Sequence, residues 1–215
     1  MTVQEIARIQ ESFVAAAKRA LATGFEWLEL HYAHGYLAHE FYSPLANKRT
    51  DSYGGNFENR IRFLLETFTA VRKVWPERFP LTVRLSVTDW IEGGVTVDDS
   101  VELVRRLKAA GLDLLDVSHG SITPDISQVP WAPGFMIPAA SRIRRESAIP
   151  TAVGWQITEP RQADDAIRDQ HTDLVMLARE MLRDPYWPYH AALTLGVEKA
   201  PEVLPIQYAR AVKKR

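Results

Sequence analysis

The sequence predicts an α/β protein with a parallel β-sheet of five strands that alternate with helices, as in an open doubly wound sheet or in part of a (β/α)₈ TIM barrel. Short apolar segments alternate with longer segments of helical periodicity, which is typical of right-handed βαβ units. The predicted strands are apolar along most of their length, as in a sheet that is buried on both faces. Polar residues stand at the C-terminal ends of these strands, where a barrel places its active site.

A helix is predicted first, because Thr2 and Glu5 form a capping box and apolar residues recur on one helical face up to Gly24. Glycine, proline and Asn-type caps bound the later elements. The predicted strands are Phe25–His31, Pro80–Ser86, Leu112–Ser118, Ile149–Gly154 and Asp173–Ala178. The predicted later helices span 56–75, 96–107, 138–147, 159–168 and 187–195, and residues 201–215 are expected to form an irregular C-terminal tail.

Composition excludes several classes of function. The chain has 215 residues, 46% of them hydrophobic, and a formal net charge of -1, so we expect one domain over 1–215 that binds neither nucleic acid nor a membrane. It has no cysteine, which excludes disulfides, iron–sulfur clusters and cysteine zinc sites and fits a cytoplasmic location. No stretch resembles a signal peptide or reaches the roughly 18 apolar residues of a membrane helix.

Two parallel architectures fit five strands. One is a small open doubly wound sheet, and the other is the last five-eighths of a barrel, whose full form typically needs about 250 residues. The glycine-rich loop that a dinucleotide-binding doubly wound fold places after its first strand is missing. The polar strand ends favour the barrel.

The most informative segment is Glu29–Leu37, at the end of the first predicted strand. His31, His34 and Tyr36 lie within six residues there, and each can donate a hydrogen bond or polarise a substrate. Histidine is also a common metal ligand, but no third and fourth ligands accompany the pair, so we expect no metal.

At this point the sequence resembles the old yellow enzymes, which are flavin-dependent ene-reductases, and most closely their thermophilic-like and xenobiotic-reductase branch. The resemblance spans essentially the whole chain. It rests on His31-x-x-His34-Gly35-Tyr36-Leu37, on the fixed positions between Phe41 and Arg62, and on Val83-Arg84, Asp116-Val117-Ser118, Gly154 and the segment 178–185.

The resemblance implies a single FMN-binding (β/α)₈ TIM-barrel domain in which only strands 4–8 are present and the first three strands are absent. We therefore expect the missing N-terminal half to come from a separate chain, or a homo-oligomer to form. The implied activity is NAD(P)H-dependent reduction of activated C=C bonds in α,β-unsaturated carbonyl or nitro compounds, with FMN and NADPH (or NADH) as cofactors. The alternative is a non-catalytic fragment, or one subunit of a split barrel, that binds flavin only with its missing half.

The resemblance also implies the catalytic roles. His31 and His34 would hold the oxygen of an enone substrate, which gains negative charge in the transition state, and Tyr36 would donate a proton to the α-carbon. Arg84 would lie beside N1 and O2 of the flavin and stabilise its reduced anion. The other interpretation of Arg84 is an ion pair inside the barrel.

The phosphate of FMN is expected at the ends of the last two strands, where barrels often bind phosphate. The residues would be Gly154, Ala178 and Arg179, assisted by Ser118, although the family usually has glycine in place of Ala178 and Gly154 could simply end a strand tightly. Two further contacts with substrate are expected, each with a structural alternative. They are Trp155, which could instead only pack, and Arg210 reaching into a neighbouring subunit, which could instead lie in a solvated tail.

Overall fold

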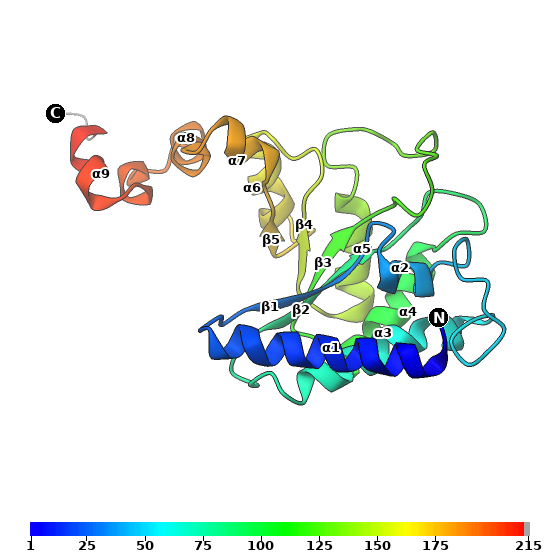
Figure 1. The fold of residues 1–215 in the computed structure, drawn as a ribbon. Coiled ribbons are helices and arrows are strands. Elements are labelled where there is room, and N and C mark those ends of the chain that lie inside the picture. The colour runs from blue at the N-terminus through cyan, green and yellow to red at the C-terminus, as the bar shows by residue number, and fades with distance from the viewer. Residues whose placement is uncertain (213–215) are drawn as a thin grey trace.

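The protein is built around a five-stranded parallel sheet in the order β1-β2-β3-β4-β5 (Figure 1). The structure is a computed structural model and describes residues 1–212. All neighbouring strands pair in parallel, and the register aligns His31, Arg84 and Asp116 across the first three. The strands are β1 (Leu28–Tyr32), β2 (Leu81–Ser86), β3 (Leu114–Ser118), β4 (Thr151–Val153) and β5 (Leu174–Val175). The prediction of five parallel strands is confirmed, although β4 and β5 are shorter than expected.

The helices connect these strands in sequence order. Helix α1 begins with the predicted capping box, in which the Glu5 N–H donates to the Thr2 hydroxyl and the Thr2 N–H donates to the Glu5 carboxylate. Two short helices, α2 and α7, were not predicted. The α-helices are α1 (Val3–Ala22), α2 (Leu37–Tyr42), α3 (Phe57–Arg72), α4 (Val97–Ala109), α5 (Ile137–Ser147), α6 (Pro160–Arg168), α7 (Arg179–Arg183), α8 (Trp187–Thr194) and α9 (Ile206–Val212).

One face of the sheet carries the hydrophobic core. Helix α1 packs on α3, α3 on α4, and α4 on α5 (Figure 1). Fully buried side chains of the strands and helices meet there, and the rings of Phe41 and Phe63 stack with their centroids 4.5 Å apart. This continuous apolar layer holds the strands in register and therefore fixes the positions of the residues at their ends.

The other face is only partly covered. Glu29 and His31 of β1 are exposed on it. Thr82 on β2 is buried because the Trp27 indole lies over it and donates to its hydroxyl at 3.1 Å. Strands β1 and β5 form the two edges of the sheet, and in the described residues no further strand pairs with either edge.

The C-terminal segment extends away from the sheet as an arm (Figure 1). The sequence suggested an irregular chain from Pro201 onward, but a 3₁₀ helix, Ala200–Val203, and helix α9 occupy most of it. The proline does not prevent this because it stands in the first turn, where its missing N–H needs no helical partner. Residues 213–215 of the predicted tail lie outside the described residues.

Across residues 1–212, no helix combines the length and apolar character needed to cross a membrane. The same residues include no cluster of three or more histidine, aspartate or glutamate side chains placed to hold a metal ion.

Candidate functional site

His31 and His34 lie side by side at the C-terminal end of β1. Their ring centroids are 5.1 Å apart, and the Tyr36 ring lies 5.5 Å from that of His31. The backbone turns sharply here, because His34 and Gly35 have φ values of 60° and 72°. This turn brings both imidazoles to the same side of the strand end.

Contacts from distant segments hold this turn. The His34 N–H donates to the Ser86 hydroxyl at 3.0 Å, and the Gly35 N–H donates to Nδ1 of His39 at 3.0 Å. A Cβ added to Gly35 would lie only 2.2 Å from the backbone oxygen of Ser121. Glycine is therefore required at position 35 both by the positive φ and by the close approach of the β3–α5 loop.

His39 fixes the turn through a buried hydrogen-bond network that the sequence analysis did not find. Its Nδ1 accepts from Gly35, so its Nε2 carries the proton and donates to Asp89 at 2.9 Å. Asp89 also accepts from the Ser43 hydroxyl at 2.7 Å and the Val95 N–H at 2.8 Å. Burial alone would raise the pKa of Asp89, but the hydrogen bonds from His39, Ser43 and Val95 hold it below its usual value.

The imidazole ring of His34 is held by Ser118, at the end of β3. Its Nε2 lies 2.6 Å from the Ser118 hydroxyl oxygen, which also accepts the Trp155 indole N–H at 2.9 Å. Burial and the neighbouring cation of Arg84 lower the pKa of His34 to about 4. The same two causes lower the pKa of His31. Both imidazoles are therefore neutral near pH 7, and each carries one N–H donor.

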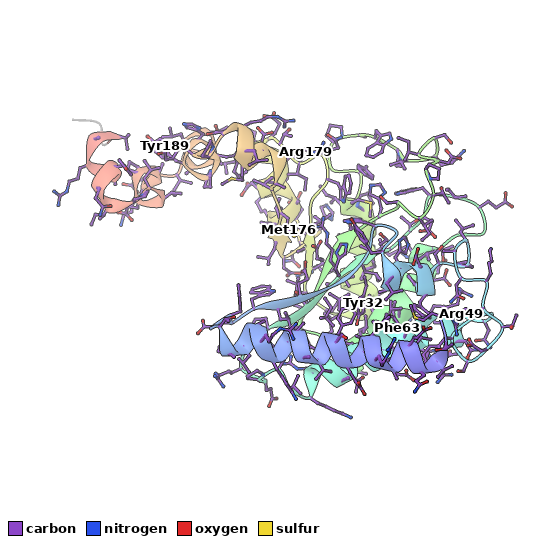
Figure 2. All side chains as sticks on the ribbon, viewed as in Figure 1. Tyr32, Arg49, Phe63, Met176, Arg179 and Tyr189 are labelled. Carbon is purple, nitrogen blue, oxygen red and sulfur yellow. The ribbon has the colours of Figure 1, made fainter. Side chains whose placement is uncertain are left out.

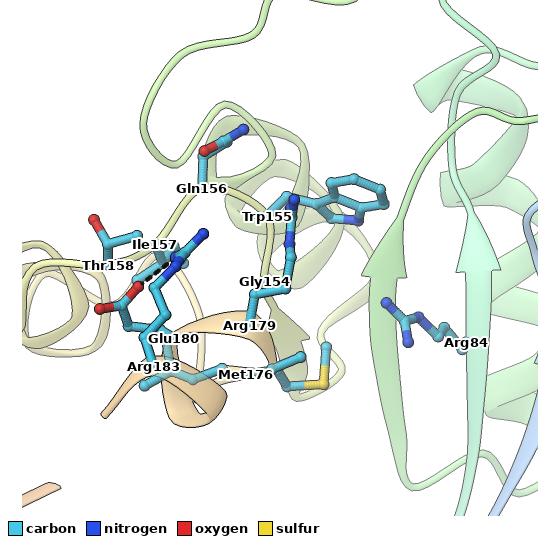
Figure 3. A pocket seen from close by; sticks show the side chains of 12 residues that line it. Arg84, Gly154, Trp155, Gln156, Ile157, Thr158, Met176, Arg179, Glu180 and Arg183 are labelled. Atoms are coloured by element: carbon cyan, nitrogen blue, oxygen red, sulfur yellow. Dashed lines mark hydrogen bonds and ion pairs between the residues drawn. The ribbon is translucent and has the colours of Figure 1, made fainter. Parts of the chain in front are cut away.

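A cavity of about 410 Å³ opens beside these residues, at the C-terminal ends of β4 and β5 (Figure 3). Arg84 extends toward it from β2, while Arg179, Glu180 and Arg183 lie on its other side. Arg183 is paired with Glu180 at 2.8 Å, whereas Arg179 forms no ion pair with any residue of the described chain. The cavity therefore has an excess of positive charge and suits an anionic group. Its lining residues are Arg84, Gly154–Thr158 and Met176–Glu180, with Arg183.

Figure 2 places the cavity relative to the core. Met176 and Arg179 lie toward the arm, well away from Tyr32 and Phe63 in the packed layer between sheet and helices. The cavity therefore lies at the margin of the hydrophobic core, beside the end of β5, and Ile157 belongs to both.

Arg84 also forms the predicted interior ion pair. Its Nε lies 3.2 Å from a carboxylate oxygen of Asp116, but the geometry of a hydrogen bond is not met, and the other Asp116 oxygen has no described partner. Burial raises the pKa of Asp116 to about 7 even though Arg84 lowers it, and the nearby Glu29 carboxylate raises it further. The two interpretations of Arg84 do not exclude each other, because its side chain pairs with Asp116 and still borders the cavity.

Trp155 packs against other aromatic rings and also borders the cavity. It lines the cavity, and its ring packs against His119 with centroids 4.5 Å apart, next to Trp131 and Phe135. The backbone at Trp155 and Gln156 has φ values of 66° and 55°, so the chain holds a left-handed turn directly after Gly154. Such strain often accompanies functional sites.

The structure thus brings most of the predicted residues together. Arg84, Gly154, Trp155, Ala178 and Arg179 line one cavity. The imidazole pair and Ser118 adjoin it through Trp155, and the ring of Tyr36 lies against His31. In contrast, Arg210 is exposed on α9 and lies on the arm outside this cavity.

Comparisons with known proteins identify the family to which the chain belongs. A family model described as "NADH:flavin oxidoreductase / NADH oxidase family" matches residues 1–197. A protein named NADPH dehydrogenase from Geobacillus thermodenitrificans is 46% identical over 210 residues, which cover 98% of this chain and 60% of the relative. A NADPH dehydrogenase from Halalkalibacterium halodurans is 43% identical, again over 98% of this chain and 60% of its own length. The chain therefore spans about 60% of the length of these curated relatives.

Solved structures show the same relationship. A 2-naphthoyl-CoA reductase in complex with 2-naphthoyl-CoA matches with a TM-score of 0.81 and 31% identity, over 91% of this chain and 30% of that one. Morphinone reductase in complex with tetrahydroNAD matches with a TM-score of 0.74 and 26% identity, over 90% of this chain and 50% of that one. The five parallel strands are thus part of a TIM barrel of the old yellow enzyme type. The chain belongs to the NADH:flavin oxidoreductase / NADH oxidase family.

Proposed function

We propose that this chain belongs to an FMN- and NAD(P)H-dependent ene-reductase. It would contribute the hydrogen-bond donors that bind the substrate oxygen and the residues that bind the phosphate of FMN. The reaction would reduce activated C=C bonds of α,β-unsaturated carbonyl or nitro compounds. The single observation that carries the proposal is the pair of neutral imidazoles, His31 and His34, 5.1 Å apart beside a cationic cavity bordered by Arg84 and Arg179.

The residues of the cavity fit FMN. Arg179 lacks a carboxylate partner in the described chain and offers a planar donor set suited to phosphate. A Cβ on Gly154 would lie 3.1 Å from the Met176 carbonyl oxygen, so only glycine leaves this wall undisturbed. Ala178 keeps the backbone N–H that the family's glycine would supply. The Arg84 guanidinium reaches the cavity from the opposite side, where the edge of a flavin ring would need a positive charge.

When bound, FMN supplies the hydride that reduces the double bond. This chain's own contribution is to bind and polarise the substrate. His31 and His34 would each donate one N–H to the carbonyl or nitro oxygen, which becomes more negative as the reaction proceeds. Such a donor stabilises the transition state more than the ground state, and losing one costs roughly 3–4 kcal/mol in comparable sites.

Tyr36 would deliver the proton to the α-carbon. Its ring lies against His31, but 64% of the residue is exposed on the open face. Its acidity matters less than its position, because it must stand beside the carbon where negative charge develops. Trp155 would form the wall of the pocket between the histidine pair and the phosphate side.

The choice of NADPH or NADH as reductant is supported by the relatives rather than by any described contact. Two of them are named NADPH dehydrogenase, and the morphinone reductase structure contains tetrahydroNAD. We propose that reduced nicotinamide and the alkene use the same pocket above the flavin in turn.

We further propose that three more strands complete the barrel, from another chain or from a longer form of this protein. The two sheet edges, β1 and β5, would receive them, and the exposed Glu29 and His31 would then face an enclosed interior. If a separate chain supplies them, it should co-purify as a polypeptide of about 130–150 residues, the length of three further βα units with their loops.

Flavin binding tests the proposal most directly. We expect the purified protein to show oxidised-flavin absorption or to take up added FMN. Arg179→Ala should weaken FMN binding about 10- to 100-fold, as expected for a lost charge-assisted hydrogen bond, but should change riboflavin binding little because riboflavin has no phosphate. Arg168→Ala on α6, outside the cavity, is the control. A colourless protein that takes up no FMN, alone or with its co-purifying chain, would contradict the proposal and support a non-catalytic fragment.

A further inference from the structure

Ser118 joins two parts of the site that lie far apart in the sequence. It ends β3 and is fully buried. Its hydroxyl oxygen lies 2.6 Å from Nε2 of His34, which follows β1, and 2.9 Å from the indole nitrogen of Trp155, which follows β4. Within residues 1–212, these are the only hydrogen-bonding partners of the hydroxyl.

The direction of these two hydrogen bonds follows from the chemistry of the groups. An indole nitrogen can only donate, so the Ser118 oxygen accepts from Trp155. The Ser118 hydroxyl still has one proton of its own, and the only described acceptor within reach is Nε2 of His34. If this proton found no acceptor, a buried donor would be left unsatisfied at a cost of about 1–3 kcal/mol. The arrangement that satisfies both groups has Ser118 donating to His34.

This direction determines which nitrogen of His34 carries its proton. The imidazole is neutral near pH 7, because burial and Arg84 lower its pKa to about 4. A neutral imidazole has one N–H, and a nitrogen that accepts a hydrogen bond cannot be the one that carries it. The proton of His34 is therefore on Nδ1.

We propose that Ser118 is a positioning residue that fixes His34 as its Nδ1–H tautomer, so that Nδ1–H is the donor offered to the substrate oxygen. The role of Nδ1–H as donor to the substrate rests on the proposed function, whereas the tautomer itself does not. Trp155 supports the arrangement by occupying an acceptor position of the Ser118 oxygen, which favours the orientation in which the hydroxyl proton points at His34.

This role differs from the one expected from the sequence, where Ser118 assists in holding phosphate. The two roles compete for a single proton. If Ser118 gave its proton to a phosphate, His34 would have to donate Nε2–H to Ser118, and Nδ1 could then only accept. A histidine in that state could not donate Nδ1–H to the substrate oxygen.

The tautomer can be measured directly by NMR. Two-bond ¹H–¹⁵N correlation spectra of ¹⁵N-labelled protein distinguish protonated from unprotonated ring nitrogens, and His34→Gln assigns the signals. We expect wild-type His34 to show an unprotonated Nε2 and a protonated Nδ1. Ser118→Ala should shift the tautomer ratio toward Nε2–H by roughly threefold to tenfold, the equivalent of one hydrogen bond. Ser118→Thr retains the hydroxyl and should retain the wild-type tautomer.

Ser86→Ala is a matched control. Ser86 is the register partner of Ser118 on β2, is equally buried and bonds to the backbone N–H of His34 rather than to its ring. We expect this variant to leave the tautomer unchanged. A protonated Nε2 in the wild-type protein would overturn the proposal even if the variants failed to fold, and so would equal shifts in Ser118→Ala and Ser86→Ala. The spectra need neither cofactor nor substrate, so a protein with the expected tautomer that binds no flavin would contradict the proposed function alone.

Discussion

Replacing Asp89 with asparagine tests whether the buried network holds the His34–Gly35 turn. The Asp89 carboxylate accepts three hydrogen bonds, from His39 at 2.9 Å, Ser43 at 2.7 Å and the Val95 N–H at 2.8 Å. An amide of the same shape offers one acceptor and one donor group. If its NH₂ faces Val95, two donors meet. If it faces His39, the imidazole must change tautomer, and its Nδ1–H then meets the Gly35 N–H.

Every orientation of the substituted amide therefore leaves at least one buried donor without a partner and breaks a hydrogen bond to a charged group. Unsatisfied buried donors cost about 1–3 kcal/mol each, and hydrogen bonds to charged groups contribute about 1.5–3 kcal/mol. We expect Asp89→Asn to lower the free energy of unfolding by about 2–4 kcal/mol in urea titrations at pH 7. Asp169→Asn, at a half-exposed carboxylate after α6, should change it by less than about 0.5 kcal/mol.

The pH dependence gives an independent check. The pKa of Asp89 is lowered in the folded protein, so its carboxylate contributes stability above its unfolded pKa of about 3.9 and loses that contribution as the pH falls through the folded pKa. The difference between wild type and Asp89→Asn should be constant from pH 8 to about pH 5 and shrink in stronger acid. A difference no larger than that of Asp169→Asn, or one unaffected by acid, would refute the assigned direction of these hydrogen bonds.

Four further predictions concern the site. Burial raises the pKa of Asp116 to about 7, so wild-type stability should fall as the pH rises from about 4 to 7. The free energy of unfolding of Asp116→Asn should therefore rise relative to that of wild type over that range, by up to about 4 kcal/mol, in unfolding titrations at several pH values. Parallel pH profiles of the two proteins would contradict this. Gly35→Ala should destabilise more than Gly196→Ala, because both glycines have φ of 72° but only the first would bring a Cβ against backbone; equal melting temperatures would exclude the clash. In flavin-loaded enzyme, His34→Ala should weaken phenolic-ligand binding, and Tyr36→Phe should slow alkene reduction while sparing flavin reduction. Equal loss in both half-reactions would contradict the proton-donor role.

Local patterns were sufficient to predict the strand–helix order. Capping residues and apolar periodicity located α1 and α3, and apolar runs located all five strands. The helices that were not predicted have physical features that explain why. Helices α2 and α7 have six and five residues, too few for a helical period to be visible. The last helix, α9, has seven residues, which is likewise too short for its period to stand out within a segment expected to be irregular.

The site was predictable only where it lies within one segment or in the family's motif. His31 and His34 are three residues apart, so a single motif identifies them. His39 lies outside this motif, and the sequence gives no sign that Asp89, fifty residues away, is buried beside it. Likewise, the pairing of Ser118 with His34 spans 84 residues and joins two strand ends that only the sheet register brings together. Buried polar networks depend on tertiary structure, so a single sequence shows their members without their connections.

The electrostatics of the two histidines belong to this chain and do not depend on a completed barrel. Burial by neighbouring residues is the largest cause of the lowered pKa at both His31 and His34, followed by the positive charge of Arg84. Further strands over the open face would remove more water from the exposed His31 ring, and desolvation lowers a histidine pKa further. Completion of the barrel would therefore strengthen the neutral state rather than create it. Further strands would enclose the site, whereas the neutral N–H donors of the proposed reaction are present in the described residues already.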